Sequence, residues 1–156
     1  MKVMLVVVGR VRGEMADAVV EYEKRARRYW KFELIEVASG SPARDSSPDA
    51  VRNSEGERIL SRIPPTIDVV ALTRDGKGMD SRELSRYLEE HGIRASAGVA
   101  FVIGGAFGLG ADVLKRSRRK LSLSTMTLTH EMARLFLAEQ LYRAGTILRG
   151  EPYHKG

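Results

Sequence analysis

The chain has 156 residues, of which 43% are hydrophobic, a composition that suits one globular domain and excludes a disordered chain. It contains no cysteine, which excludes a disulfide scaffold, a thiolate metal site and a cysteine nucleophile. Its three histidines, His91, His130 and His154, form no HxxxH pair, so we expect no metal site.

The formal net charge is +6, which favours a polyanionic partner such as RNA or DNA over a merely solvated basic surface. Many of the cations are clustered, and clusters form patches that contact phosphates. The two clusters are Lys24, Arg25, Arg27, Arg28 and Lys31, and Lys115, Arg116, Arg118, Arg119 and Lys120.

The first half of the chain alternates strands and helices. Residues 3–8 form an apolar run that predicts a buried parallel strand. This run is too short for a signal sequence or a membrane span, so we expect a cytoplasmic protein with no membrane association. Helical spacing predicts a helix over 14–30, and alternation predicts a strand near a sheet edge over 32–37. A loop follows over 39–48, and a helix over 49–62 that Pro64 and Pro65 stop.

The second half continues the alternation. Asp80 and Glu83 resemble a capping box that opens a helix, and Thr129 is placed to cap the last one. Strands are predicted over 67–72, 98–103 and 121–125, helices over 80–92, 111–119 and 130–147, and a tail over 148–156.

This order of elements predicts an α/β fold, with an open and mostly parallel sheet that carries helices on both faces. No linker divides the chain, so we expect a single domain over residues 1–156. In such sheets the ligand binds beyond the carboxyl ends of the strands. The loops after Leu72, Ile103 and Thr125 are therefore the candidate ligand site.

The segment 104–110 has four glycines in seven residues directly after a buried strand. Such density favours a ligand that approaches the backbone closely over a tight turn without a ligand. Gly105 and Gly110 have the spacing of a Walker loop, but Ala111 and Asp112 stand where its Lys and Ser or Thr are required. The order of a dinucleotide fingerprint is reversed as well. The turn fits a ligand without phosphates better than a nucleotide with them.

Several segments carry a resemblance to a known family: VVVG at 6–9, FELIE at 32–36, DGK at 75–77, FVIGG at 101–105, GL at 108–109, LSLSTMTLTH at 121–130, EQLYRA at 139–144 and RGEPYHK at 149–155. On these segments, over essentially its whole length, the chain resembles the ribosomal large-subunit methyltransferase H family, which belongs to the SPOUT class of S-adenosylmethionine-dependent RNA methyltransferases.

The resemblance implies a C-terminal trefoil knot and a homodimer with the active site at the subunit interface. It also implies methylation of N3 of a pseudouridine in large-subunit (23S) ribosomal RNA, on the assembled ribosome. The alternative is a non-catalytic, ribosome-associated RNA-binding protein on the same scaffold. By position, the implied S-adenosylmethionine site comprises Leu72, Gly104, Gly105, Leu123, Ser124, Thr125, Met126, Thr127 and Leu128. The chain departs from many relatives at Thr73 and Arg74, where an acidic residue is usual, and at Thr129, where proline is usual.

The acceptor nitrogen of pseudouridine must lose a proton, which a positioned base or a nearby cation assists. His154 is the leading candidate for contact with the target base, with Tyr153 beside it; the alternative is an interface contact. His130 is placed as a neutral base or hydrogen-bond partner, or else as a capping residue. Arg143 is placed to contact phosphate or stabilise the base anion, or else is a surface charge.

Overall fold

A computed structural model describes residues 1–156. The five strands are β1 (Lys2–Val8), β2 (Lys31–Val37), β3 (Asp68–Gly78), β4 (Val99–Ile103) and β5 (Arg119–Ser122). They form one sheet in the order β2-β1-β4-β3-β5, and every pair is parallel. The prediction of an α/β fold with a mostly parallel sheet is confirmed, and the strand predicted near an edge is the edge strand β2. The trefoil knot stays a prediction.

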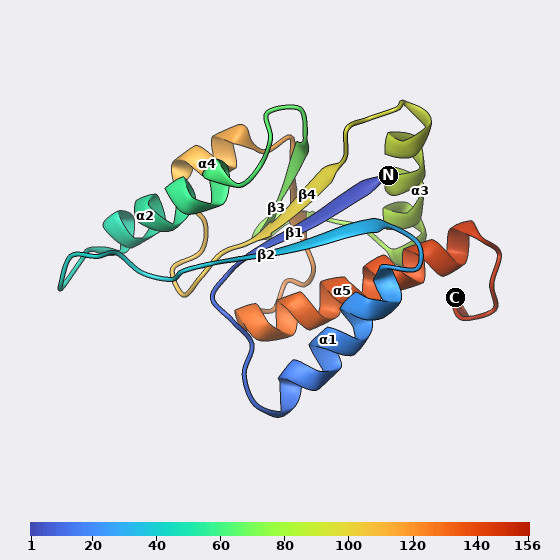
Figure 1. The fold of residues 1–156 in the computed structure, drawn as a ribbon, viewed down its shortest axis with the longest axis horizontal. Coiled ribbons are helices and arrows are strands. Elements are labelled where there is room, and N and C mark those ends of the chain that lie inside the picture. The colour runs from blue at the N-terminus through green and yellow to red at the C-terminus, as the bar shows by residue number, and fades with distance from the viewer.

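Helices cover both faces of the sheet (Figure 1). They are α1 (Glu14–Ala26), α2 (Pro48–Ser61), α3 (Ser81–Ile93), α4 (Ala111–Arg116) and α5 (His130–Leu148). Alternate residues of β1 divide between two cores: Val3, Leu5 and Val7 face the helices α1, α3 and α5, whereas Met4, Val6 and Val8 face α2 and α4. Because both faces of the central strands β1 and β4 are covered, residues 3–8 and 99–103 are apolar without interruption.

Local signals set the helix boundaries. Asp80 and Glu83 form the predicted capping box of α3, and the Thr129 side chain accepts a hydrogen bond from the Met132 amide at the start of α5. The predicted helix over 14–30 is wrong at its end, because α1 stops at Ala26. The indole of Trp30 donates to the Leu141 carbonyl (2.9 Å), so Trp30 anchors this turn to α5.

Three other predicted boundaries are wrong. The strand predicted over 121–125 lies at Arg119–Ser122, because residues 122–126 form a turn. The helix predicted over 111–119 ends at Arg116, since Arg119 already pairs with Val70 of β3 at the start of β5. The strand predicted over 67–72 continues to Gly78 through an irregularity between Leu72 and Lys77. Polar residues in that extension broke the apolar pattern, although the backbone still pairs with β5.

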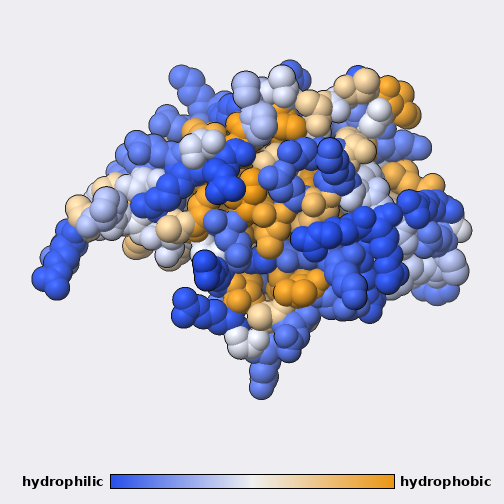
Figure 2. Space-filling model, viewed as in Figure 1, coloured by the Kyte–Doolittle hydropathy of each residue, from blue (hydrophilic) through white to orange (hydrophobic).

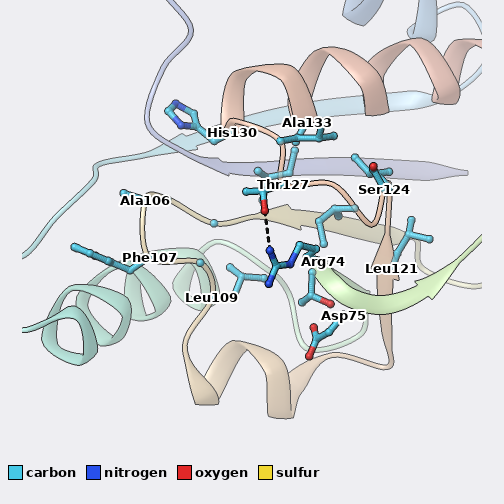
Figure 3. A pocket seen from close by; sticks show the side chains of 18 of the residues that line it. Arg74, Asp75, Ala106, Phe107, Leu109, Leu121, Ser124, Thr127, His130 and Ala133 are labelled. Carbon is cyan, nitrogen blue, oxygen red and sulfur yellow. Dashed lines mark hydrogen bonds between the residues drawn. The ribbon is translucent and has the colours of Figure 1, made fainter.

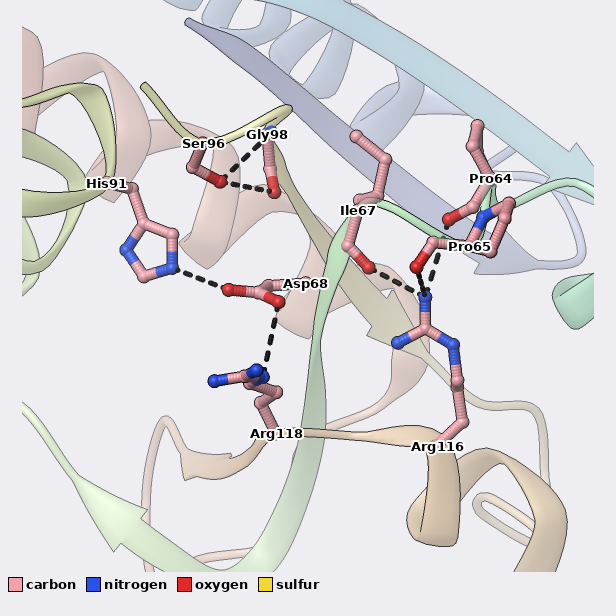
Figure 4. A network of polar contacts seen from close by, with 9 residues as sticks. All are labelled: Pro64, Pro65, Ile67, Asp68, His91, Ser96, Gly98, Arg116 and Arg118. Carbon is pink, nitrogen blue, oxygen red and sulfur yellow. Dashed lines mark hydrogen bonds and ion pairs between the residues drawn. The ribbon is translucent and has the colours of Figure 1, made fainter. Parts of the chain in front are cut away.

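The basic cluster 115–120 lies at the amino end of β3, opposite the candidate ligand loops (Figure 4). Arg116 donates to the carbonyls of Pro64, Pro65 and Ile67, and Arg118 approaches Asp68, which also contacts His91. Part of this cluster therefore stabilises the fold, while most of the Arg118 side chain stays exposed.

Hydrophilic side chains dominate the surface in Figure 2, with apolar side chains gathered near the middle of this face. None of the helices combines the length and the apolar character that a membrane crossing requires. Nowhere do three His, Cys, Asp or Glu side chains gather in the way a metal ion requires.

Candidate active site

A cavity of about 400 Å³ opens at the carboxyl ends of the central strands (Figure 3). It is lined by 20 residues from three main segments: residues 72–75 of β3, residues 103–109 after β4, and residues between 121 and 133 from β5 to the first turn of α5. These are the segments that follow Leu72, Ile103 and the short strand at 121, so parallel pairing brings together the loops selected from the sequence.

The glycine turn forms one wall; space requires a glycine at 104 and restricts position 105, whereas backbone conformation favours a glycine at 108. A Cβ on Gly104 would lie 2.7 Å from the backbone carbon of Gly108, and one on Gly105 would lie 3.0 Å from both carboxylate oxygens of Glu55. Gly108 has a φ of +76° and donates its amide to the Gly105 carbonyl (3.0 Å). The backbone thus folds back on itself directly after the carboxyl end of β4. This tight turn leaves the cavity open.

Two buried polar atoms near the cavity have no hydrogen-bond partner in the chain. One is Oγ1 of Thr73, a residue that lines the cavity. The other is Oε1 of Glu55, behind the glycine turn; this side chain is 3% exposed and accepts from the Gly40 amide through Oε2 (2.8 Å). Buried polar atoms are normally satisfied, so the Thr73 hydroxyl marks a place where a ligand can supply the missing bond.

The segment 123–129 forms the facing wall. Ser122 donates its hydroxyl to the Ser124 carbonyl and the Ser124 hydroxyl accepts from the Met126 amide, both at 2.9 Å, which fixes a tight turn. Met126 is 77% exposed although it lines the cavity. The structure brings Leu72, Gly104, Gly105, Leu123, Ser124, Met126, Thr127 and Leu128 together around the cavity. Thr125 is exposed and does not line it.

The charged side chains of the cavity are few. Arg74, Asp75 and His130 line it, and Arg74 reaches across to donate to the Thr127 hydroxyl (2.9 Å; Figure 3). His130 is the first residue of α5, and its Nε2 lies 3.9 Å from the Glu131 carboxylate. Of the four predicted catalytic residues, only His130 lies at the cavity of its own chain.

The other three predicted catalytic residues form a second group, the tail cluster, made of Glu139, Arg143, Tyr153 and His154. Arg143 donates to Glu139 Oε1 through Nε (3.0 Å) and Nη2 (2.6 Å), and Tyr153 donates to the same oxygen (3.1 Å). Arg143 Nη1 lies 3.1 Å from His154 Nδ1. A guanidinium only donates, so Nδ1 is the acceptor, and a neutral His154 then carries its proton on Nε2.

The tail cluster holds its protons tightly. Burial, reinforced by the Glu139 carboxylate, raises the pKa of Tyr153 to about 12, so this phenol stays neutral at physiological pH. The hydrogen bond to Glu139 raises the pKa of Arg143, which therefore stays charged. The cluster presents a fixed cation and hydrogen-bond donors rather than a strong base.

The cavity and the tail cluster lie at opposite ends of α5. His130 begins the helix and Arg143 follows thirteen residues later, a separation of roughly 20 Å at about 1.5 Å per residue. Beyond the end of α5 the tail turns back, so that Tyr153 contacts Glu139 and His154 contacts Arg143 (Figure 1). A single chain in this form does not bring the two groups to one ligand.

Sequence reasoning missed three features. Asp75 and Phe107 line the cavity, and Glu55 lies behind the glycine turn. The extended β3 carries Asp75 to the site, which a strand ended at Leu72 does not show. Only one feature of the sequence points to Glu55: it precedes the apolar Ile59 by four residues, so both lie on the buried side of α2.

Comparison with known proteins defines the class. Residues 1–154 match the model of a family described as predicted SPOUT methyltransferase, and the chain belongs to this family. Three relatives carry the name ribosomal RNA large subunit methyltransferase H. That of Gemmatimonas aurantiaca is 53% identical over 99% of this chain and 100% of its own length. Those of Carboxydothermus hydrogenoformans and Bacillus pumilus are 39% and 41% identical over 99% of this chain and 100% of their own lengths.

Proposed function

We propose that the protein is an S-adenosylmethionine-dependent methyltransferase that methylates N3 of a pseudouridine in large-subunit (23S) ribosomal RNA, on the assembled ribosome in the cytoplasm. The observation that carries the proposal is the convergence of the 72–75, 103–109 and 121–128 segments on one cavity. The names of the full-length relatives support ribosomal RNA as the substrate. The net charge of +6 suits that polyanion.

The cavity suits S-adenosylmethionine in size and chemistry. Its volume of about 400 Å³ lies within the range of roughly 300–1,000 Å³ usual for small-molecule sites. Gly104 and Gly105 let the turn pack tightly against Gly108 and Glu55, and the Cβ position of Gly108 is open, so a flat ring can approach the backbone there. When bound, the cofactor supplies a methyl group on a sulfonium, and the protein positions the acceptor and keeps water out.

The tail cluster suits the acceptor. With Nδ1 facing Arg143, a neutral His154 carries its proton on Nε2, which serves as the donor to a carbonyl of the target base. The positive charge of Arg143 stabilises the imide anion that remains after N3 loses its proton. Tyr153 packs its ring under the guanidinium of Arg143 (4.7 Å to the centroid) and keeps it in place. These residues thus lower the cost of ionising the base.

A homodimer joins the two groups. Met126, Met132 and Phe136 are exposed on the cavity loop and the first two turns of α5, an apolar surface of the kind that marks a subunit interface. We propose that a second copy covers this surface and brings its tail cluster to the cavity. The separation of roughly 20 Å along α5 within one chain supports an active site shared by two chains.

Calorimetry tests the cofactor. We expect one S-adenosylmethionine site per chain, lost on Gly104→Val and kept on Gly92→Ala, a helical glycine with open space around its Cβ position. Absence of binding at millimolar cofactor contradicts the enzyme and leaves the non-catalytic RNA-binding protein as the explanation.

Mass spectrometry of ribosomal RNA tests the substrate. A strain that lacks the gene is expected to lose N3-methylpseudouridine from the large subunit, and the wild-type gene to restore it, whereas an Arg143→Ala gene does not. An unchanged level of that nucleotide in the deletion strain contradicts the assigned target even if the cofactor binds.

A further inference from the structure

The cavity contains one fixed cation and one carboxylate that are not paired with each other or with any other charge. Arg74 makes a single side-chain hydrogen bond, to the neutral Thr127 hydroxyl, and takes part in no ion pair. Asp75 makes no side-chain hydrogen bond and no ion pair, although the two residues are adjacent and both line the cavity. Both residues lie in the irregular part of β3, between Leu72 and Lys77.

This pattern differs from the other arginines that line functional parts of the chain. Arg143 is held by Glu139, and Arg134 is held by Glu23 and Glu36. A guanidinium that spans a cavity and has only a hydroxyl as its partner retains most of its donors for a ligand. The planar fork of the guanidinium matches a carboxylate or a phosphate, and of these two groups the proposed cofactor carries only a carboxylate.

We propose that Arg74 binds the carboxylate of the cofactor's methionine moiety and so makes the cavity selective for the intact amino-acid end of S-adenosylmethionine. This inference rests on the proposed function. Arg74 is the only permanently charged cation among the lining residues, since His130 is charged only when protonated. The cofactor carries one carboxylate and two positive centres, and Arg74 with Asp75 offers the complementary pair of signs.

The hydrogen bond to Thr127 gives Arg74 a second, structural role. It joins β3 to the loop 123–129, two opposite walls of the cavity (Figure 3). A carboxylate that enters between them replaces or shares this hydrogen bond, because the guanidinium has five N–H donors and Thr127 takes only one. Arg74 therefore remains able to hold the loop while it binds the ligand.

A pair of ligands that differ by one group tests the assignment. The affinities of S-adenosylmethionine and of its decarboxylated form are measured by calorimetry at low salt, and their ratio gives the selectivity for the carboxylate. We expect Arg74→Ala to lower this selectivity about tenfold, since a partly exposed charge-assisted pair is weaker than a buried one. We expect Arg74→Lys to keep a part of it, because the charge remains and the fork is lost.

Two variants separate this role from a structural one. Thr127→Val removes the hydrogen bond across the cavity and is expected to leave the selectivity within about twofold, since the charge remains. Arg62→Ala removes an exposed arginine beyond the end of α2, at the amino edge of the sheet, and is expected to change neither affinity.

The outcomes are distinguishable. If Arg74→Ala weakens both ligands equally, or if Thr127→Val lowers the selectivity as much as Arg74→Ala does, Arg74 only supports the loop and the inference is wrong. Selectivity that stays the same in Arg74→Ala also overturns it. If the wild-type protein binds neither ligand, the proposed function itself fails. Thermal unfolding confirms that each variant is folded.

Discussion

The cavity and the tail cluster use opposite means to make a site. Backbone and apolar side chains form most of the cavity, and a glycine is required at 104 because neighbouring atoms leave no room for a Cβ. Charged and aromatic side chains form the tail cluster, and they hold one another through Glu139. A cavity lined by backbone and apolar side chains suits an uncharged ring system. The fixed hydrogen-bond donors of the tail cluster suit a base that becomes an anion.

The two regions also differ in how they depend on a partner. The cavity is complete in one chain apart from its cover, since all three of its walls come from adjacent parallel strands. The tail cluster lies farther along α5, where the returning tail contacts Glu139 and Arg143. The cavity and the tail cluster therefore act together only if a second chain is present. Substitutions that separate the two regions between chains are expected to have the largest effect on the methyltransferase rate.

Heterodimers with two different affinity tags test the shared site. Gly104→Val removes the cavity and Arg143→Ala removes the cation of the tail cluster, so each homodimer is expected to be inactive. A heterodimer of the two variants retains one intact cavity and one intact tail in different chains. If sites are shared, its methyltransferase rate is expected to be about half that of the wild type.

The reciprocal heterodimer is the control. Both substitutions placed in one chain, paired with a wild-type chain, leave each shared site with one defect, so we expect no activity. Half activity from this pair, with none from the first, places each tail at the cavity of its own chain and contradicts the shared site.

A smaller substitution separates the cavity from the tail. Gly104→Ala places a Cβ 2.7 Å from backbone of Gly108, where no flexible side chain can yield. Displacement of the turn is expected to weaken S-adenosylmethionine about a hundredfold in calorimetry, while overpacking costs about 1–3 kcal/mol of folding free energy. Gly92→Ala serves as the matched control. Wild-type affinity in Gly104→Ala contradicts the role of the turn in binding.

The sequence predicted the cavity better than its details. Strand order and the rule for carboxyl ends were sufficient to select the three loops, because parallel pairing makes consecutive strands end at one edge. The orientation of individual residues was not predictable. Thr125 lies outside the cavity because the hydrogen bonds of Ser122 and Ser124 fold residues 122–126 into a turn, which no periodicity reveals.

Long-range contacts explain the other differences. The strand β3 continues past Leu72 because β5 offers its backbone groups, although Arg74 and Asp75 break the apolar pattern. The helix α1 ends at Ala26, since Trp30 bonds to Leu141, which lies 111 residues away in the sequence. Local patterns establish which elements exist, whereas distant partners decide where they end.

A buried ion pair in the second turn of α5 lies between the cavity and the tail cluster. Arg134 is 5% exposed and donates to Glu23 (2.9 and 3.1 Å) and to Glu36 (2.8 Å), which joins α5 to α1 and β2. Arg134→Ala leaves Glu23, which is 2% exposed, without a partner. We expect a loss of about 3–5 kcal/mol of unfolding free energy in urea titration.

Arg143→Ala is the matched control for that measurement. Its guanidinium is paired at the surface with Glu139 four residues earlier, so its removal is expected to cost at most about 1 kcal/mol. Equal losses for the two variants contradict the view that Arg134 stabilises the fold whereas Arg143 serves the ligand.

The smallest expected effect concerns the phenol of the tail cluster. Tyr153→Phe removes the hydrogen bond to Glu139 but keeps the ring against Arg143 and Tyr142, so we expect the methylation rate at neutral pH to fall by no more than about threefold. The pKa of Tyr153 is raised to about 12 in the native protein, whereas an unfolded tyrosine ionises near pH 10. Native stability therefore falls as pH rises between these two values, and Tyr153→Phe reduces that fall.

Absorbance of ionised tyrosine follows the same group directly. The pKa of Tyr29 is also raised to about 12, by burial and by its hydrogen bond to Glu151, and burial raises the pKa of Tyr87. The wild-type protein is therefore expected to show a late-ionising fraction to which Tyr29, Tyr87 and Tyr153 contribute. Tyr153→Phe removes one part of this fraction and leaves the parts from Tyr29 and Tyr87. If the late fraction does not change, Tyr153 is not held by Glu139, and the tail cluster lacks the rigidity that sets it apart from the cavity.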